Sequence, residues 1–289
     1  MKKEKIIIIA GPTGVGKTST SIDLALKLNG EIISADSMQI YKGMDIGTAK
    51  IKEEEMNGVP HHMLDIADPF DNFTVADYSK MARQKISEIG ERGKIPIIVG
   101  GTGLYINSLL YKMDFNQAQA DEDYRAKLWN FYEENGEDAL FQLLQEQAGN
   151  QTVNVDKQNI KRVIRVLEII KSKGEFKNFD QAPEESEFDC ELYILSRDRE
   201  VLYDNINKRV EIMFEEGLVD EVKKLKSMGL NSSHQSMKGI GYRQVLDYLE
   251  NACSLEEAKE KIKQESRRYA KRQITWFKRY KEAIWVEMP

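Results

Sequence analysis

Residues 11–18 read Gly11-Pro12-Thr13-Gly14-Val15-Gly16-Lys17-Thr18, and this stretch decides the fold. The fixed positions match the spacing G-x-x-x-x-G-K-[ST], an apolar run at 6–10 precedes them, and a helical pattern follows. Strand, glycine turn and helix N-terminus together form a phosphate cradle, because the backbone N–H groups of such a loop point inward. Lys17 adds a positive charge and the Thr18 hydroxyl can ligate Mg²⁺. The sequence therefore predicts an oligophosphate site, without saying which oligophosphate it binds.

Composition limits the class of protein. The 289 residues are enough for one large domain or for a core with an insertion, and 41% hydrophobic residues support a buried core. The formal net charge of −6 argues against a protein that coats nucleic acid uniformly. A local basic groove stays open, because the charge of a patch matters more than the sum.

The cysteines and the first residues indicate the compartment. Cys190 and Cys253 lie far apart and form no CxxC pair, so we expect neither a disulfide framework nor a zinc knuckle. A reducing, cytoplasmic location is the simplest interpretation. The first apolar run is too short for a signal segment or a membrane span. We expect a monomer with no membrane association and no stable protein partner.

A second strand is predicted at 31–35, and Asp36 lies just past its end. Ligands of open α/β sheets bind at the carboxyl ends of the strands, so Asp36 should face the same crevice as the phosphate loop. A turn aspartate or a helix N-cap is the ordinary alternative. His61 and His62 point to opposite sides of an extended chain, so we interpret them as structural residues and not as a metal site.

A third apolar strand, at 95–99, ends in Gly100-Gly101-Thr102-Gly103. Many phosphate-loop hydrolases have an acidic residue at this position, which orders Mg²⁺ and water. Glycines and a threonine make a hydrolytic motor less favoured. Thr102 is suited to donate a hydrogen bond to a phosphate or to a leaving group.

Beyond residue 112 the alternation of strands and helices breaks. Residues 112–122 and 174–191 look like loops, and helices are predicted at 124–134, 138–147 and 156–173. The sheet resumes at 191–195, a helix or helix pair follows at 200–228, and 284–286 looks like an edge strand. We therefore predict an α/β fold: a phosphate-loop NTPase-like parallel sheet core with C-terminal helices (1–112 and 191–289) and a helical insertion domain (113–190).

The tail at 265–281 differs from the rest in its charge. A solvated basic helix is the ordinary interpretation, and binding to a nucleic-acid backbone with aromatic support is the alternative. A single acid, Glu265, stands against the cations of this stretch. Those cations are Arg267, Arg268, Lys271, Arg272, Lys278, Arg279 and Lys281, and the aromatic residues interleaved with them are Tyr269, Trp276, Phe277 and Tyr280.

Several segments, taken together and in order, resemble the tRNA dimethylallyltransferase family, also called tRNA isopentenyltransferases. They run from residue 11 to residue 277 and cover most of the chain. The phosphate loop alone is common to many families, whereas 35–50 and 100–105 are far more specific. The matching segments are 11–18, 33–50, 59–66, 99–105, 159–165, 239–242 and 269–277.

This resemblance implies transfer of a dimethylallyl group from dimethylallyl diphosphate to N6 of the adenosine just 3′ of the anticodon, in tRNAs that read codons beginning with U. It assigns the diphosphate to Gly11, Pro12, Thr13, Gly14, Val15, Gly16, Lys17 and Thr18, with Mg²⁺ on Thr18. It adds Thr102 and Arg209 as catalytic contacts to the same diphosphate. Asp36 matches the family's proposed base, and an aspartate can also act by orienting the amine.

The resemblance also implies contacts with the tRNA anticodon stem-loop. The target base must leave its stack to reach the cleft. The insertion would act as a clamp, and the basic tail would add phosphate contacts. The implied contact residues are Asp36, Ser37, Met38, Gln39, Gln158, Asn159, Ile160, Lys161, Arg162, Lys271 and Arg272.

Three other functions stay open at this point. A small-molecule kinase uses the same loop on ATP, but usually carries an arginine-bearing lid over the nucleotide. A prenyltransferase for free adenine nucleotides would have no use for the insertion or the basic tail. A non-catalytic RNA-binding module leaves Asp36 and Thr102, beside a complete phosphate loop, unexplained. Whether ATP also binds the loop is not decided by the sequence.

Overall fold

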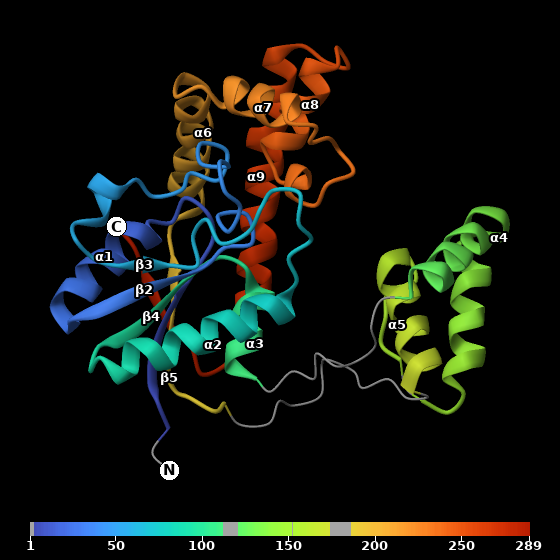
Figure 1. The fold of residues 1–289 in the computed structure, drawn as a ribbon, viewed down its shortest axis with the longest axis horizontal. Coiled ribbons are helices and arrows are strands. Elements are labelled where there is room, and N and C mark those ends of the chain that lie inside the picture. Colours follow the sequence, from blue (N-terminus) through green and yellow to red (C-terminus); the bar gives the residue numbers. More distant parts are fainter. Residues whose placement is uncertain (1–2, 112–120, 152, 174–185) are drawn as a thin grey trace. The chain divides into compact units, whose positions relative to one another are not determined.

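The computed structural model describes residues 3–111, 121–151, 153–173 and 186–289 (Figure 1). The chain divides into two compact units. Unit 1 is Met1–Tyr111 with Ser186–Pro289, and unit 2 is Lys112–Glu185. Most of the two loops predicted at 112–122 and 174–191 lies outside the described residues.

Unit 1 contains a six-stranded sheet in the order β3-β2-β4-β1-β5-β6, in which every pair of neighbours is parallel. This confirms the predicted α/β class with a parallel sheet. β1 lies inside the sheet, so the loop that follows it opens at the carboxyl edge between neighbouring strands. The strands are β1 Lys5–Ala10, β2 Gly30–Ala35, β3 His61–His62, β4 Ile95–Gly100, β5 Asp189–Ser196 and β6 Ile284–Glu287.

Helices cover both faces of this sheet. Side chains alternate along a strand, so Ile6 and Ile8 pack with α2 and α3 on one face, and Ile7 and Ile9 pack with α1 and α6 on the other. Helix α9 contributes to both clusters, and Figure 1 shows it running beside α6. The helices are α1 Lys17–Leu28, α2 Val75–Glu91, α3 Gly103–Leu110, α6 Arg199–Glu215 and α9 Leu255–Phe277.

A further core cluster joins the segment around Tyr41 and Met44 to the last helices. It packs against α7 Leu218–Ser227 and α8 Tyr242–Leu249. The predicted helical region at 200–228 is therefore a pair, α6 and α7, separated at Gly217 with φ 101°. Short 3₁₀ turns lie at Glu53–Met56 and Ser236–Lys238.

Two helix ends show how local sequence sets the boundaries. Thr74 and Asp77 form a capping box at the start of α2. α1 ends at Leu28, where Asn29 takes the left-handed position at φ 51° and Gly30 already belongs to β2. Gly30 is required there by close approach: a Cβ would lie 2.8 Å from the backbone oxygen of Ile95.

Unit 2 is helical in its described residues. α4 runs over Glu122–Ala148 but has a non-helical residue at Gly136 (φ 82°, ψ 179°), which separates the two predicted helices. α5 runs over Ile160–Lys173 and begins four residues later than predicted, after a turn that Asp156 supports. Leu140, Leu144 and Leu167 belong to a separate core cluster of this unit.

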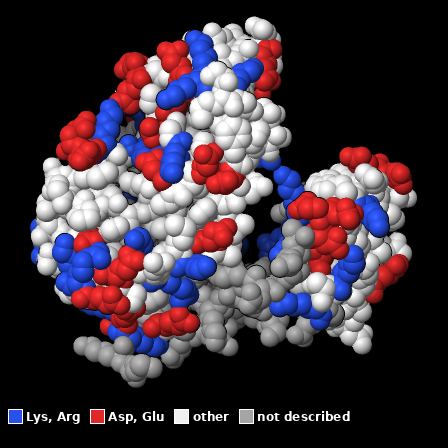
Figure 2. Space-filling model, viewed as in Figure 1, with Lys and Arg blue, Asp and Glu red and all other residues white. Residues whose placement is uncertain are grey.

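The surface and the cysteines fit the composition. Cys190 and Cys253 are both free. Figure 2 shows basic and acidic side chains lying next to each other over much of the face in view. Across the described ranges, no helix is both long enough and apolar enough to cross a membrane.

Candidate functional site: a phosphate cradle beside an aspartate

The phosphate loop joins β1 to the 12-residue helix α1. Gly14 (φ 79°) and Gly16 (φ 104°) adopt left-handed conformations that favour glycine. The carbonyls of Gly11 and Pro12 are occupied, because Lys17 Nζ donates to them at 2.9 and 2.8 Å. Within the described part of the chain, the backbone N–H groups of residues 14–18 donate to no protein acceptor. Free donors at a helix N-terminus make this loop an anion site.

Two cations meet at the loop. Burial and then the nearby charge of Arg209 lower the pKa of Lys17 to about 7, against an opposing effect of Asp36. Burial lowers the pKa of Arg209, which Asp36 likewise opposes. Arg209 Nη2 donates to Thr48 O at 3.1 Å, but the buried Nε has no partner among the described residues. Arg209 of α6 therefore lies near the phosphate loop and has no ion-pair partner among the described residues.

Asp36 lies directly after β2 and is partly buried. Its Oδ1 accepts the N–H groups of Met38 at 2.8 Å and Gln39 at 3.4 Å, so one oxygen does fasten a turn. Its Oδ2 has no hydrogen-bond partner in the described ranges. One oxygen fixes the carboxylate and the other is available to a ligand.

Thr102 ties the end of β4 to the end of β2. Its N–H donates to Ala35 O at 3.2 Å, and its Oγ1 accepts the N–H of Ser37 at 3.1 Å. Gly100 allows this approach, because a Cβ there would lie 2.2 Å from Ala35 O. The threonine predicted from the glycine-rich strand end therefore lies beside the Asp36 turn.

The segment 36–39 is held firmly from within. Gln39 Nε2 donates to Thr48 O at 3.3 Å, and its Oε1 accepts the Ser34 hydroxyl at 3.1 Å. Met38 packs against Gly239, where a Cβ would lie 2.6 Å from the methionine Cε. The side chains of Met38 and Gln39, which the sequence predicts as tRNA contacts, thus also pack and hydrogen-bond within the protein and hold the turn after Asp36 in place.

Glu221 of α7 is a supporting residue that the sequence did not reveal. Its carboxylate accepts the backbone N–H groups of residues 45–47 at 2.8–3.1 Å and the Tyr242 hydroxyl at 2.7 Å. The turn fixed in this way presents the Thr48 carbonyl to Arg209 and Gln39. An acidic residue in an amphipathic helix looks like part of a solvated face, so sequence gives no signal of this role.

Helix α9 contributes one face to the site and exposes the other. Lys271 and Arg272 are exposed, as the predicted phosphate contacts require. The predicted aromatic support is wrong for Phe277 and Tyr280, which are 0% and 6% exposed and belong to the core. Tyr269 instead approaches Thr102 and Asp36; burial and then the Asp36 charge raise its pKa to about 12.

The other predicted tRNA contacts lie in unit 2, at the start of α5. Asn159 caps this helix, because its Oδ1 accepts the N–H of Arg162 at 3.2 Å. Ile160 packs at the edge of the unit 2 core. Gln158, Lys161 and Arg162 are exposed. No ion pair of Lys161 or Arg162 occurs among the described residues.

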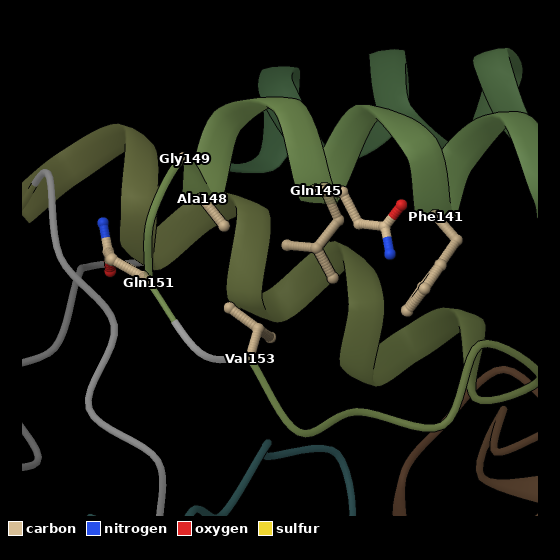
Figure 3. Close-up of a pocket in the computed structure, with 7 residues that line it drawn as sticks. Phe141, Gln145, Ala148, Gly149, Gln151 and Val153 are labelled. Carbon is tan, nitrogen blue, oxygen red and sulfur yellow. The ribbon is translucent and has the colours of Figure 1, made fainter.

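A hollow of about 250 Å³ also lies in unit 2, between the end of α4 and the segment that follows it (Figure 3). Phe141, Leu144, Ala148 and Val153 line it with apolar groups. It contains no titratable side chain, so it lacks the means for acid–base or phosphate chemistry.

The donor set at the loop fits a magnesium ion held mainly by its phosphate ligand. Thr18 is exposed and its hydroxyl has no protein partner in the described ranges. The described residues contain no group of three or more His, Cys, Asp or Glu side chains that could form a metal cage. Mg²⁺ characteristically keeps waters and substrate phosphates as ligands, with one or two protein oxygens.

Comparison with known proteins places this geometry in a family. The sequence profile of the family described as IPP transferase matches residues 39–280. A tRNA dimethylallyltransferase of Halalkalibacterium halodurans is 49% identical over 99% of this chain and 92% of its own length. One of Bacillus mycoides is 48% identical over 100% and 91%.

Solved structures agree with the sequence matches. A crystal structure of the full-length tRNA isopentenylpyrophosphate transferase of Bacillus halodurans superposes with a TM-score of 0.75 at 48% identity, over 99% of this chain and 90% of that one. A eukaryotic dimethylallyltransferase acting on tRNA superposes with a TM-score of 0.85 at 30% identity, over 98% and 74%. These matches confirm the resemblance seen in the sequence motifs, and the chain therefore belongs to the IPP transferase family.

Proposed function

We propose that this protein is a tRNA dimethylallyltransferase. It transfers the dimethylallyl group of dimethylallyl diphosphate to N6 of the adenosine 3′-adjacent to the anticodon, in tRNAs reading codons that begin with U. One observation carries the proposal. Free anion donors of the phosphate loop and an available oxygen of Asp36 lie at the carboxyl ends of β1 and β2, the two strands that flank β4.

The loop suits the departure of diphosphate. The allylic C–O bond breaks while negative charge gathers on the diphosphate oxygens. Free N–H groups of residues 14–18, Lys17 and Arg209 are fixed before the reaction, so they stabilise that charge without rearranging. The Thr102 hydroxyl would donate a hydrogen bond to the same group. Lys17 and Arg209 repel each other in the free protein, and a bound diphosphate would remove this repulsion by placing negative charge between them.

Asp36 suits the accepting side. The N6 amine is a weak nucleophile, because its lone pair is delocalised into the adenine ring. As the C–N bond forms, the amine must lose a proton, and Oδ2 of Asp36 would take it. The hydrogen bonds from Met38 and Gln39 to Oδ1 hold the carboxylate in one orientation for that transfer.

Mg²⁺ is proposed as the cofactor, with the Thr18 hydroxyl as its protein ligand and the diphosphate as the other. When bound, it would neutralise part of the charge on the departing diphosphate. The protein's own groups, Lys17 and Arg209, would hold the remaining oxygens.

The tRNA is proposed to bind through two sets of exposed residues. One is the start of α5 in unit 2, residues 158–162, and the other is the outer face of α9 with Lys271 and Arg272. Exposed cations without acidic partners are available to phosphates of the anticodon stem-loop. The adenosine would leave its stack to reach Asp36.

The test is nucleoside mass spectrometry of tRNA after incubation with the protein, Mg²⁺ and isotope-labelled dimethylallyl diphosphate. Labelled dimethylallyladenosine at the position 3′ of the anticodon supports the proposal. Labelled product from free AMP but not from tRNA would favour a nucleotide prenyltransferase. Transfer of the γ-phosphate of ATP would favour a kinase. The absence of turnover under all of these conditions would favour a non-catalytic RNA-binding module.

A further inference from the structure

One side chain of α9 lies between the two loops that build the cleft. Gln273 is only 6% exposed. Its Oε1 accepts the backbone N–H of Thr13 in the phosphate loop at 2.9 Å. Its Nε2 donates to the backbone O of Gly101, after β4, at 2.9 Å. A single amide thus spans the donor side and the Thr102 side of the site.

The two hydrogen bonds fix the orientation of the Gln273 amide, with its oxygen toward Thr13 and its nitrogen toward Gly101. Turning it over would set Nε2 against the Thr13 N–H and Oε1 against the Gly101 carbonyl, which leaves two buried polar groups unpaired. The Thr13 N–H is therefore committed to the protein. This separates it from the N–H groups of residues 14–18, which stay free for an anion.

Helix α9 packs directly against the backbone of the loop after β4. A Cβ at Gly101 would lie 2.1 Å from Gln273 Nε2, and a Cβ at Gly103 would lie 2.2 Å from the Trp276 indole nitrogen. These glycines are required because α9 touches the backbone, and not because the strand end needs a left-handed turn. The helix therefore sets how far apart the two loops stand.

We propose that Gln273 is a positioning residue for the reaction: it holds the phosphate loop and the Gly101–Thr102 segment at the separation that in-line transfer requires. The inference rests on the proposed function, because the phosphate loop is proposed to hold the diphosphate, and Thr102 is proposed to contact that diphosphate while it packs beside the Asp36 turn. Reacting atoms must be about 3–3.5 Å apart, so small shifts of one loop reduce turnover strongly.

Gln244 of α8 supplies a matched control. It is 0% exposed, its Oε1 accepts the Gly241 N–H at 2.9 Å and its Nε2 donates to Glu265 at 2.9 Å. Both glutamines are therefore buried amides with one accepted and one donated hydrogen bond, but the partners of Gln244 are the N-cap residue of α8 and a residue of α9, and neither belongs to the phosphate loop. Replacing either glutamine by methionine keeps the volume and removes both hydrogen bonds.

The experiment compares Gln273→Met, Gln273→Glu and Gln244→Met with the full-length wild type. Thermal midpoint, kcat, KM for tRNA and the affinity for inorganic diphosphate are measured for each. We expect kcat of Gln273→Met to fall roughly 10- to 100-fold, with KM for tRNA within about threefold. Gln244→Met should lower the midpoint by a similar amount and leave kcat near wild type.

Gln273→Glu keeps an acceptor for Thr13 and loses the donor for Gly101, so it should lose kcat as well. Equal kcat for wild type and both Gln273 variants would overturn the proposal, and so would an equal loss in Gln244→Met. If the wild type itself modified no tRNA, the proposed function would fail first. The inference would then depend on diphosphate affinity alone: weaker binding in Gln273→Met supports it, and unchanged binding overturns it.

Discussion

The two ends of the parallel sheet treat charge in opposite ways. At the amino end of β2, the buried carboxylate of Glu31 is bound by three side chains: His62 Nε2 lies at 2.6 Å, Arg92 Nη2 at 2.7 Å and Lys94 Nζ at 3.0 Å. Burial by itself would raise the pKa of Glu31. The hydrogen bonds from Arg92, His62 and Lys94 outweigh it and lower the pKa to about 2.

At the carboxyl end the balance is the reverse. In the described ranges, Lys17 and Arg209 form no ion pair, Arg209 Nε has no partner, and Asp36 keeps one oxygen open. Charges that are taken out of water without an ion-pair partner lower stability. At the amino end, the charge of Glu31 is balanced by other side chains of the protein. At the carboxyl end, the charges of Lys17 and Arg209 are balanced only when an anionic ligand binds.

The largest effect is expected for Asp36→Asn. The amide oxygen can still accept the Met38 N–H, so the turn should survive, but the amide cannot take a proton. Turnover in single-turnover assays should fall about 100- to 10,000-fold while tRNA affinity stays the same. Intact tRNA affinity together with wild-type turnover would remove Asp36 from the chemistry.

Arg209→Met tests the unpaired cation. We expect the affinity for inorganic diphosphate, measured by calorimetry, to fall about 10- to 100-fold, because a charge-assisted hydrogen bond contributes about 1.5–3 kcal/mol. The free protein should be as stable as wild type or more stable, since a buried charge short of partners is removed. A clear loss of stability in the absence of ligand would contradict the contrast between the two ends.

Glu31→Gln tests the completed end. Removing the carboxylate leaves the Arg92 and Lys94 cations without their shared counter-charge, so the unfolding free energy from urea titration should fall by about 2 kcal/mol. This is below the 3–5 kcal/mol of fully buried pairs, because Arg92 and Lys94 are partly exposed. Turnover per folded molecule should not change. A loss of turnover at full folding would show that the two ends are coupled.

The same carboxylate predicts a pH dependence of stability. Because the folded-state pKa of Glu31 lies near 2 and its ordinary value is 4.5, its contribution is fully present above about pH 4.5 and is lost as pH falls toward 2. The stability difference between wild type and Glu31→Gln should therefore shrink across that window. A difference that is constant from pH 6 to pH 3 would contradict the cluster's role.

The smallest effects concern exposed cations outside the cleft. Lys271→Ala and Arg162→Ala should each weaken tRNA binding modestly and reduce the salt slope of log K by about one counterion. Lys27→Ala, an exposed lysine on α1, serves as the control and should leave the slope unchanged. Identical slopes for all three variants and wild type would count against the proposed tRNA surface.

Residues near one another in the chain were predictable. The phosphate loop, Asp36 after β2 and Thr102 after β4 each depend on a short motif and on the rule that ligands bind at the carboxyl ends of strands. The same local reasoning anticipated that His62 is structural, and its contact with Glu31 confirms this. The matched family also follows from such motifs, because their order along the chain is specific.

Contacts between distant segments were not predictable. Arg209 reaches Thr48 across 161 positions, and Gln273 reaches Thr13 across 260. Helical periodicity indicates that Ala270, Gln273 and Phe277 share a buried face, but not what that face meets. The basic residues of α9 drew attention to its exposed side, whereas the side chain nearest the cleft is a neutral amide.

The hydrogen bond between Thr13 and Gln273 also determines when, during synthesis of the chain, the site can form. Ribosomes add about 5–20 residues per second, so a phosphate loop already synthesised waits roughly 15–50 s before residue 273 is joined to the chain. Until then the loop lacks the amide that fixes it against the β4 segment. A nascent chain therefore carries the phosphate-binding motif long before it carries a finished catalytic cleft, and catalytic competence arrives only after residue 273 has been added.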